Sequence, residues 1–212
     1  FENLIGKSFS EIRGKTDLLH LIDHPSMVGQ LDLTKMLAKV DVVVVPKPVY
    51  LEASFTVDDR IIQQVKSSII DGNQPQVIIE GDAFKLNNCN KTVGGQAAID
   101  IERMLAYELT EQQLGDSTAI YTHPHGRRYL APDSVVIRTH GSAGQSYAAF
   151  LNDGMRMEHL GTCNDGVGKS ACGGTLVVES PGGGIKTPGN NVLIGNFALF
   201  GATGGKFFIN GE

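Results

Sequence analysis

The sequence predicts a mainly β fold, a right-handed parallel β-helix of about 20 residues per turn that follows a partly helical connector. Two observations predict it. Residues 141–212 hold 17 of the 26 glycines. From Val135 onward no helical periodicity remains, and Gly154, Gly174 and Gly205 recur at sequence steps of 20 and then 31. Successive turns of such a solenoid stack and share one continuous interior.

Four short apolar segments follow the same repeat and are expected to be its strands: 135–139, 155–159, 175–179 and 206–210. They superpose at sequence steps of 20, 20 and 31, and a loop rich in Gly, Pro and Asn at 182–191 accounts for the extra 11. The third position of each segment is apolar and is expected to face the interior: Ile137, Met157, Val177 and Phe208.

Small residues mark the predicted corners of the turns. Gly141, Gly161 and Pro181 are expected to share one corner, and ten residues before each repeating glycine stand Gly144, Asn164 and Gly195. Glycine suits a corner because it adopts positive φ and lets neighbouring backbones approach closely.

The chain is expected to divide into a connector, residues 1–74, and the β-helix domain, residues 75–212. Short helical turns are predicted at 9–12, 16–19 and 31–37, before Pro46 and Pro48 break the pattern.

Two longer helices and one short strand are also predicted. In a helix over 60–70, which ends before Asp71 and Gly72, one face is apolar: Ile61, Ile62, Val65 and Ile69. Residues 77–80 read as a strand. A helix over 95–114 is expected to end at Gly115, with four apolar residues on its buried side: Ile99, Ile101, Leu105 and Leu109.

Composition excludes several classes of protein. The 212 residues carry a net charge of −5, which offers no footprint for nucleic acid or an anionic membrane. No apolar run is long enough to span a membrane.

The chain begins at Phe1 rather than Met, which suggests a processed chain or a fragment. Three cysteines in no framework spacing, Cys89, Cys163 and Cys172, predict reduced thiols in a reducing compartment.

The stretch CNDGVGKSACGG, residues 163–174, contains the end of a phosphate-binding P-loop pattern. The first glycine of that pattern should stand at position 163, which is Cys163. The residues after Ser170 include a glycine pair and β-branched residues, which disfavour the helix that a P-loop requires. We therefore expect a corner of the solenoid and no nucleotide site.

The remaining polar candidates also favour structural roles. His123 and His125 share a loop without metal-ligand spacing, and Arg127 and Arg128 could bind an anion but fit a solvated surface better. His140 and His159 are expected to be hydrogen-bonded structural residues near corners.

No nucleophile or acid pair is complete either. Cys172 is expected to be buried and inert. Ser146 lacks the G-x-S-x-G context, because Ala148 follows it at the second position. Asp153 and Asp165 fall in different turns and suit corner caps. The sequence thus predicts no catalytic, cofactor-binding or metal residue in this chain.

Three glycine-rich stretches carry a family resemblance: GSAGQSYAAFLNDGM (141–155), LGTCNDGVGKSACGGTLVV (160–178) and NNVLIGNFALFGATGGKFF (190–208). They resemble the C-terminal GXGXG domain of the glutamate synthase large subunit. The upstream segments 8–19 and 31–41 resemble the segment that follows the flavin domain in that family, and residues 90–94 resemble the entry to its β-helix. The family pattern continues past the position of Glu212, so a β-helix truncated at its C-terminal end is expected.

The resemblance implies a function for a parent enzyme. Glutamate synthases release ammonia from glutamine at an amidotransferase domain and use it at a flavin domain to make glutamate from 2-oxoglutarate. The implied role of this chain is a non-catalytic β-helix packed against those two domains. FMN and an iron–sulfur cluster belong to the parent, and no cofactor is expected here. The implied location is the cytoplasm, or the plastid stroma in a photosynthetic eukaryote, and a homo-oligomer is possible.

Two other classes are alternatives. A stand-alone GXGXG assembly subunit, like that of formylmethanofuran dehydrogenase, is disfavoured because residues 8–41 resemble the glutamate synthase connector. An independent nucleotide-binding enzyme is disfavoured by Cys163.

Overall fold

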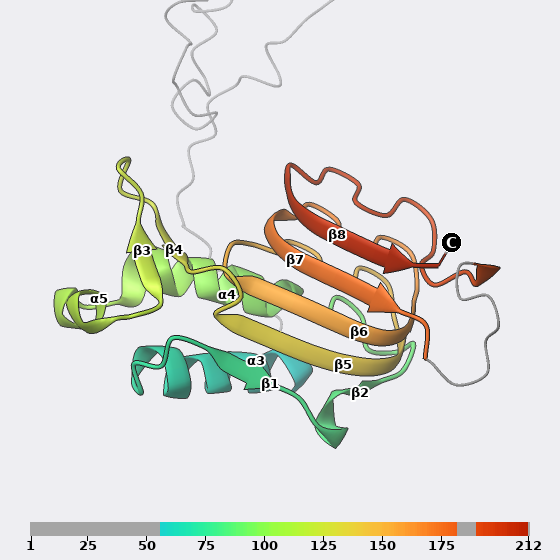
Figure 1. Cartoon of the computed structure of the whole chain (residues 1–212), viewed down its shortest axis with the longest axis horizontal. Helices are drawn as coiled ribbons and strands as arrows, with labels where there is room; N and C mark the ends of the chain where they lie inside the picture. The colour runs from blue at the N-terminus through green and yellow to red at the C-terminus, as the bar shows by residue number, and fades with distance from the viewer. Residues whose placement is uncertain (1–55, 182–189, 212) are drawn as a thin grey trace, which may run out of the picture. The chain divides into compact units, whose positions relative to one another are not determined.

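A computed structural model describes residues 56–181 and 190–211, in which helices pack against a mostly parallel sheet (Figure 1). The helical elements are α3 (Thr56–Val65), η3 (Lys66–Ile70), η4 (Asp82–Phe84), α4 (Gly95–Arg103), η5 (Met104–Glu108) and α5 (Glu111–Asp116). The strands are β1 (Val77–Ile79), β2 (Lys85–Leu86), β3 (Ile120–Thr122), β4 (Arg128–Leu130), β5 (Val135–Ala143), β6 (Met155–Cys163), β7 (Cys172–Glu179) and β8 (Gly204–Asn210). The helical turns predicted at 9–12, 16–19 and 31–37 lie outside the described residues.

The main sheet has six strands in the order β1-β5-β6-β7-β8, with β2 also paired to β5. Every pair in it is parallel, whereas β3 and β4 form a separate antiparallel hairpin. The sheet is open. The expectation of a mainly β chain therefore needs correction, because the described residues form a mixed α/β arrangement in which helices contribute to the same core.

The strand register confirms part of the predicted repeat. Strands β5 and β6 pair at a sequence step of 20 and β7 and β8 at 31, as in Val135↔Met155 and Thr175↔Lys206. Strands β6 and β7 pair at 19, as in Arg156↔Thr175. The predicted second step of 20 is thus wrong by one residue within the strands.

That single residue changes which side chains face inward, because alternate residues of a strand point to opposite faces. The inward-facing row runs through Ile79, Ile137, Met157 and Leu176, which are buried, and ends at Phe207, which is half-buried and packs against the core. The predicted interior positions Val177 and Phe208 are wrong: Val177 is half-buried, and Phe208 is 56% exposed. Pro181 also lies beyond the end of β7, outside the corner where Gly141 pairs with Gly161.

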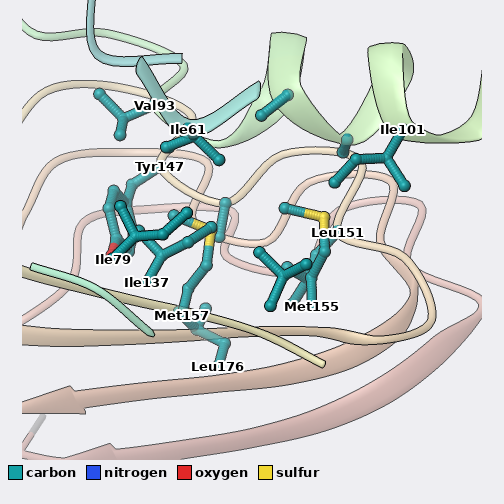
Figure 2. Close-up of a cluster of buried hydrophobic side chains, with 14 of the residues drawn as sticks. Ile61, Ile79, Val93, Ile101, Ile137, Tyr147, Leu151, Met155, Met157 and Leu176 are labelled. Carbon is teal, nitrogen blue, oxygen red and sulfur yellow. The ribbon is translucent and has the colours of Figure 1, made fainter. Parts of the chain in front are cut away.

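The core lies between the sheet and the helices α3 and α4. Figure 2 shows Ile61 and Ile101 from these helices on one side of a cluster that includes Ile137, Met157 and Leu176 from the strands. Each of these five side chains is fully buried, which stabilises the fold by roughly 1.5–3 kcal/mol per side chain.

The helix predicted over 60–70 and the strand predicted over 77–80 are confirmed. Helix α3 and η3 bury Ile61, Val65 and Ile69, and the helical segment ends before Asp71. Strand β1 covers three of the four predicted residues.

The helix predicted over 95–114 is broken. It ends after η5, where Leu109 is extended, and Thr110 begins α5 with a capping box closed by Gln113. Gly115 lies inside α5 rather than stopping the long helix. Ile99 is 45% exposed, since the buried face is formed by other residues: Ala97, Ala98, Ile101, Met104 and Leu105.

A buried carboxylate joins α3 to the start of α4. Asp58 Oδ1 accepts a hydrogen bond of 2.9 Å from the backbone N–H of Ala97. Burial raises the pKa of Asp58 to about 6, against the opposing effect of backbone N–H donors that include Ala97. Because unsatisfied N–H groups at a helix start attract a carboxylate, Asp58 acts as a cap supplied by a neighbouring helix.

Candidate functional site

The glycine-rich region forms three stacked turns, which we call the turn layers: residues 146–150, 166–170 and 197–201. In each layer the first, third and fifth residues have positive φ: Ser146, Ala148 and Phe150; Gly166, Gly168 and Ser170; Phe197, Leu199 and Gly201. The same alternation in all three layers shows that one backbone geometry is repeated, although only three of the nine residues are glycine.

Backbone hydrogen bonds connect the turn layers. The N–H of Gly168 donates to the carbonyl of Tyr147 in the first layer, over 2.9 Å. The N–H of Leu199 donates to the carbonyl of Val167 in the second layer, over 2.7 Å. The layers therefore stack at sequence steps of 20 and 31, as the repeat predicts.

Glycine suits the second layer because it adopts positive φ without strain and because side chains of the third layer lie close to where a Cβ would be. A Cβ at Gly166 would lie 3.0 Å from the ring of Phe197, and a Cβ at Gly168 would lie 2.7 Å from Leu199. Gly154, Gly174 and Gly205 also share positive φ and contacts too close for a Cβ, so their predicted common geometry is confirmed.

The P-loop-like stretch is the second turn layer. Gly166 to Ser170 follow β6 and lead into β7, so no helix presents its N-terminus to a phosphate there. The structure confirms that these residues form a turn between strands.

A groove of about 670 Å³ lies beside the hairpin of β3 and β4. The hairpin contributes His123, His125, Arg127 and Tyr129, and the strand starts contribute Met155, Cys172, Thr175 and Lys206. The backbone N–H of His125 donates to Nδ1 of His123, so His123 is fixed with its proton on Nε2 when it is neutral.

The predicted arginine pair has internal partners. Arg127 donates to Glu102 over 3.0 Å and to Asp153 over 2.9 Å, which joins the hairpin to α4 and to the turn before β6. Arg128 donates to the carbonyl of Leu105. Since these guanidinium groups are engaged with the protein, anion binding by the pair is not supported.

The cysteine prediction is wrong in one respect. Cys172, expected to be buried, is exposed in the groove, because it begins β7 at an irregularity in the pairing with β8. Burial and the nearby Glu102 raise the pKa of its thiol. Cys163 is the buried cysteine, and burial raises the pKa of its thiol to about 12. All three cysteines are free, as predicted.

The other predicted polar residues do not converge on a reaction centre. Asp165 accepts a hydrogen bond from the backbone N–H of Asn196 over 2.6 Å, as a corner cap should. Asp153 instead binds Arg127. Ser146 lies in the first turn layer, where no described imidazole or carboxylate binds its hydroxyl. His159 is hydrogen-bonded and buried, as predicted, whereas His140 on β5 has no ring hydrogen bond to a described residue.

The outer face of the sheet carries a row of alternating charges beside a hollow of about 570 Å³. Arg138 binds Glu80 and Glu158, each over 2.9 Å, and Arg156 binds Glu158 over 2.6 Å. Burial would raise the pKa of Glu158, but these arginine hydrogen bonds outweigh it and hold the pKa below its ordinary value. The row therefore cross-links strands at the surface.

The described part of the chain offers neither a cluster of metal ligands nor a membrane-spanning helix. Residues 56–181 and 190–211 contain no group of three His, Cys, Asp or Glu side chains placed to hold a metal ion. Within the same ranges, no helix has the length and apolarity needed to cross a membrane.

Stacked turns joined to parallel strands define a repeat-built structural domain. The family model described as "GXGXG motif" matches residues 58–212. The chain belongs to this family.

Relatives of the whole chain are large enzymes. The chain is 30% identical to the glutamate synthase [NADPH] large chain of Azospirillum brasilense and 30% identical to that of Bacillus subtilis. It is 31% identical to the chloroplastic ferredoxin-dependent glutamate synthase of Spinacia oleracea. Each match covers 97% of this chain and 12% of the relative, so the chain spans about an eighth of the proteins it matches.

Proposed function

We propose that this chain is a non-catalytic structural domain of a glutamate synthase large chain, an oxidoreductase that serves ammonia assimilation and glutamate biosynthesis. The observation that carries the proposal is the coverage of the match: nearly all of this chain aligns with a small part of those large chains. The three turn layers supply a rigid stack, and the described polar side chains bind one another rather than converge on a site.

In this proposal the stacked layers are part of a right-handed β-helix. Parallel pairing at sequence steps of 20, 19 and 31 and the repeated turn geometry support it. The β-helix packs against the amidotransferase and flavin domains of the same polypeptide, which hold the FMN and the iron–sulfur cluster of the parent. The location is the cytoplasm or a plastid stroma. The stand-alone assembly subunit is less favoured, because relatives match beyond the glycine-rich region.

A chimera tests the role. The segment of the Azospirillum brasilense large chain that aligns with residues 1–212 is replaced by this chain, and FMN content and glutamate formation are measured. We expect a folded, flavin-loaded chain that still forms glutamate. A chimera that folds and binds FMN but makes no glutamate would show that the native segment supplies chemistry which the proposal denies.

The isolated chain provides a second test. The purified 212-residue protein should be colourless and should make no glutamate from glutamine and 2-oxoglutarate. Flavin or cluster absorbance, or measurable turnover, would contradict the proposal.

A further inference from the structure

Three buried side chains form one hydrogen-bonded chain beneath the first turn layer. Thr139 Oγ1 lies 2.8 Å from the hydroxyl oxygen of Tyr147 and 2.8 Å from Nδ1 of His159. The other ring nitrogen of His159, Nε2, lies 3.2 Å from the carbonyl of Gly141 and 3.1 Å from that of Thr162. Tyr147, Thr139 and His159 are 0%, 3% and 2% exposed, so bulk water does not complete the chain.

The partners fix the direction of every hydrogen bond. Carbonyl oxygens only accept, so Nε2 of His159 carries the proton and Nδ1 keeps its lone pair. The Thr139 hydroxyl must then donate to Nδ1. Its oxygen is left to accept from Tyr147. One arrangement satisfies all the groups, and it requires a neutral imidazole.

We propose that Tyr147, Thr139 and His159 form an acid-sensitive latch that holds the first turn layer against β5 and β6. A proton taken from solvent by Nδ1 turns that atom from acceptor into donor. The Thr139 hydroxyl then either donates to Tyr147, whose own proton is left without an acceptor, or accepts from Tyr147 and leaves its own proton unpaired. In both cases one buried O–H loses its partner, which favours release of the layer.

The surroundings of the imidazole mostly oppose its charge. Burial is the main cause that lowers the pKa of His159, and His140 on the neighbouring strand β5 lowers it further, while the carbonyls of Thr162 and Gly141 act in the opposite direction. The tilted ring of Tyr147, 5.1 Å away, also favours a cation.

Other titratable groups reach the latch through Tyr147. They are Asp58 on α3 and Glu158 and Cys163 on β6. Burial is the main cause that raises the pKa of the Tyr147 hydroxyl, against the opposing effect of its hydrogen bond with Thr139, and these three groups act in the same direction as burial. The hydroxyl therefore stays protonated, as the donor that the latch requires.

The sign of the pH effect follows from the lowered pKa of His159. The unfolded chain binds this proton more readily than the folded chain, so folding is favoured as the pH rises. The contribution of neutral His159 to the free energy of unfolding is complete above the ordinary histidine pKa of about 6.5. It is lost as the pH falls through the lower pKa that His159 has in the folded chain. The latch depends only on this chain's fold and is independent of the proposed function.

Nitrogen-15 NMR of the histidine rings tests the latch in the 212-residue chain. At neutral pH we expect His159 with a protonated Nε2 and a bare, hydrogen-bonded Nδ1, and a titration below the ordinary histidine value of about 6.5. The amide protection of Ala148 and Phe150 should fall when His159 titrates, by about tenfold for each unit by which the pKa is lowered. Signals of individual residues are needed because Asp58 changes the pH dependence of the overall stability in the opposite direction, which would mask the effect of His159 in a global measurement.

Variants separate the latch from general acid damage. His159→Gln should remove the acid-dependent loss of protection, whereas His140→Gln should retain it. Tyr147→Phe keeps the Thr139–His159 bond and should preserve the Nε2–H form. Its acid response should persist, because a proton on Nδ1 still leaves the Thr139 hydroxyl without an acceptor. If His159→Gln does not fold, the ring titration and Tyr147→Phe still decide. A proton on Nδ1 at neutral pH, or a titration at the ordinary histidine value of about 6.5, overturns the proposal.

Discussion

The ring of Phe197 lies where a side chain at Gly166 would have to be, 3.0 Å from the position of the missing Cβ. Leu199 stands in the same relation to Gly168, at 2.7 Å. The two glycines of the second layer thus act as sockets, positions without a side chain over which Phe197 and Leu199 of the third layer lie. The glycine pattern reflects packing between layers as well as backbone geometry.

Replacing Gly168 by alanine should destabilise the chain. Its φ is +64°, which alanine adopts at a cost of about 1 kcal/mol or more, and the contact with Leu199 adds to it. Urea unfolding measures the loss. Gly115→Ala is the control, because this glycine lies in α5 with open space around it and should be neutral or slightly stabilised. An equal loss in both variants would contradict the socket model.

Asp58→Asn should change how stability depends on pH. The pKa of Asp58 is about 6 in the folded chain, above the ordinary value of 3.8. The protonated carboxyl therefore stabilises the fold fully below pH 3.8, and this stabilisation is lost as the pH rises through 6. Between pH 4 and 7 the free energy of unfolding of the variant should therefore rise relative to that of the wild type, by at most about 3 kcal/mol. Unfolding free energies at several pH values test this, and parallel curves would refute the assignment.

Arg127→Ala should loosen the hairpin with little effect on global stability. The guanidinium is about half exposed, so its two ion pairs are expected to contribute about 1 kcal/mol or less. Cleavage between β3 and β4 by limited proteolysis should accelerate, and high salt should mimic the effect in the wild type. The control is Arg60→Ala, on the exposed side of α3. Unchanged cleavage in Arg127→Ala would show that these pairs do not hold the hairpin.

Magnesium-bound ATP and GTP should give no binding heat in calorimetry. The turn from Gly166 to Ser170 already directs its N–H groups to other backbone carbonyls, as Gly168 does to Tyr147. A signal that disappears in Lys169→Ala would revive the nucleotide-site interpretation.

Thiol reagents should distinguish the cysteines. Cys89 and Cys172 are exposed and should react in the native chain, whereas Cys163 should react only after unfolding, since it is buried and its pKa is raised. Counting labels by mass spectrometry before and after denaturation checks this. Native labelling of Cys163 would place it outside the core.

The repeat predicted the parallel pairing and the common geometry of Gly154, Gly174 and Gly205, because both follow from residues at one phase. It could not predict the step of 19 between β6 and β7, since the displaced residue lies at the irregular start of β7 and leaves no compositional trace. That displacement brings Leu176 rather than the expected Val177 into the interior.

Other features lay outside the pattern for local reasons. Ser146, Ala148 and Phe150 have positive φ without being glycine, so the first turn layer had no glycine signal. The break before α5 does have a sequence signal, the capping pair Thr110 and Gln113. The strong apolar periodicity of the preceding helix concealed that signal. The ion pairs of Arg127 join segments far apart in sequence, and only the fold brings them together.

The spacing between the second and third layers also shows where this fold accepts a change of length. Glu179 pairs with Asn210 at the longer step of the repeat, so the extra residues follow Glu179. The N–H of Cys163 donates to the carbonyl of Leu193, also at about the longer step, so the extra residues precede Leu193. The additional residues of that longer step therefore fall between Glu179 and Leu193, and the stack resumes in phase after them. Because closing a longer loop costs free energy only slowly with length, this corner is where insertions and deletions can accumulate during divergence without altering the layers on either side.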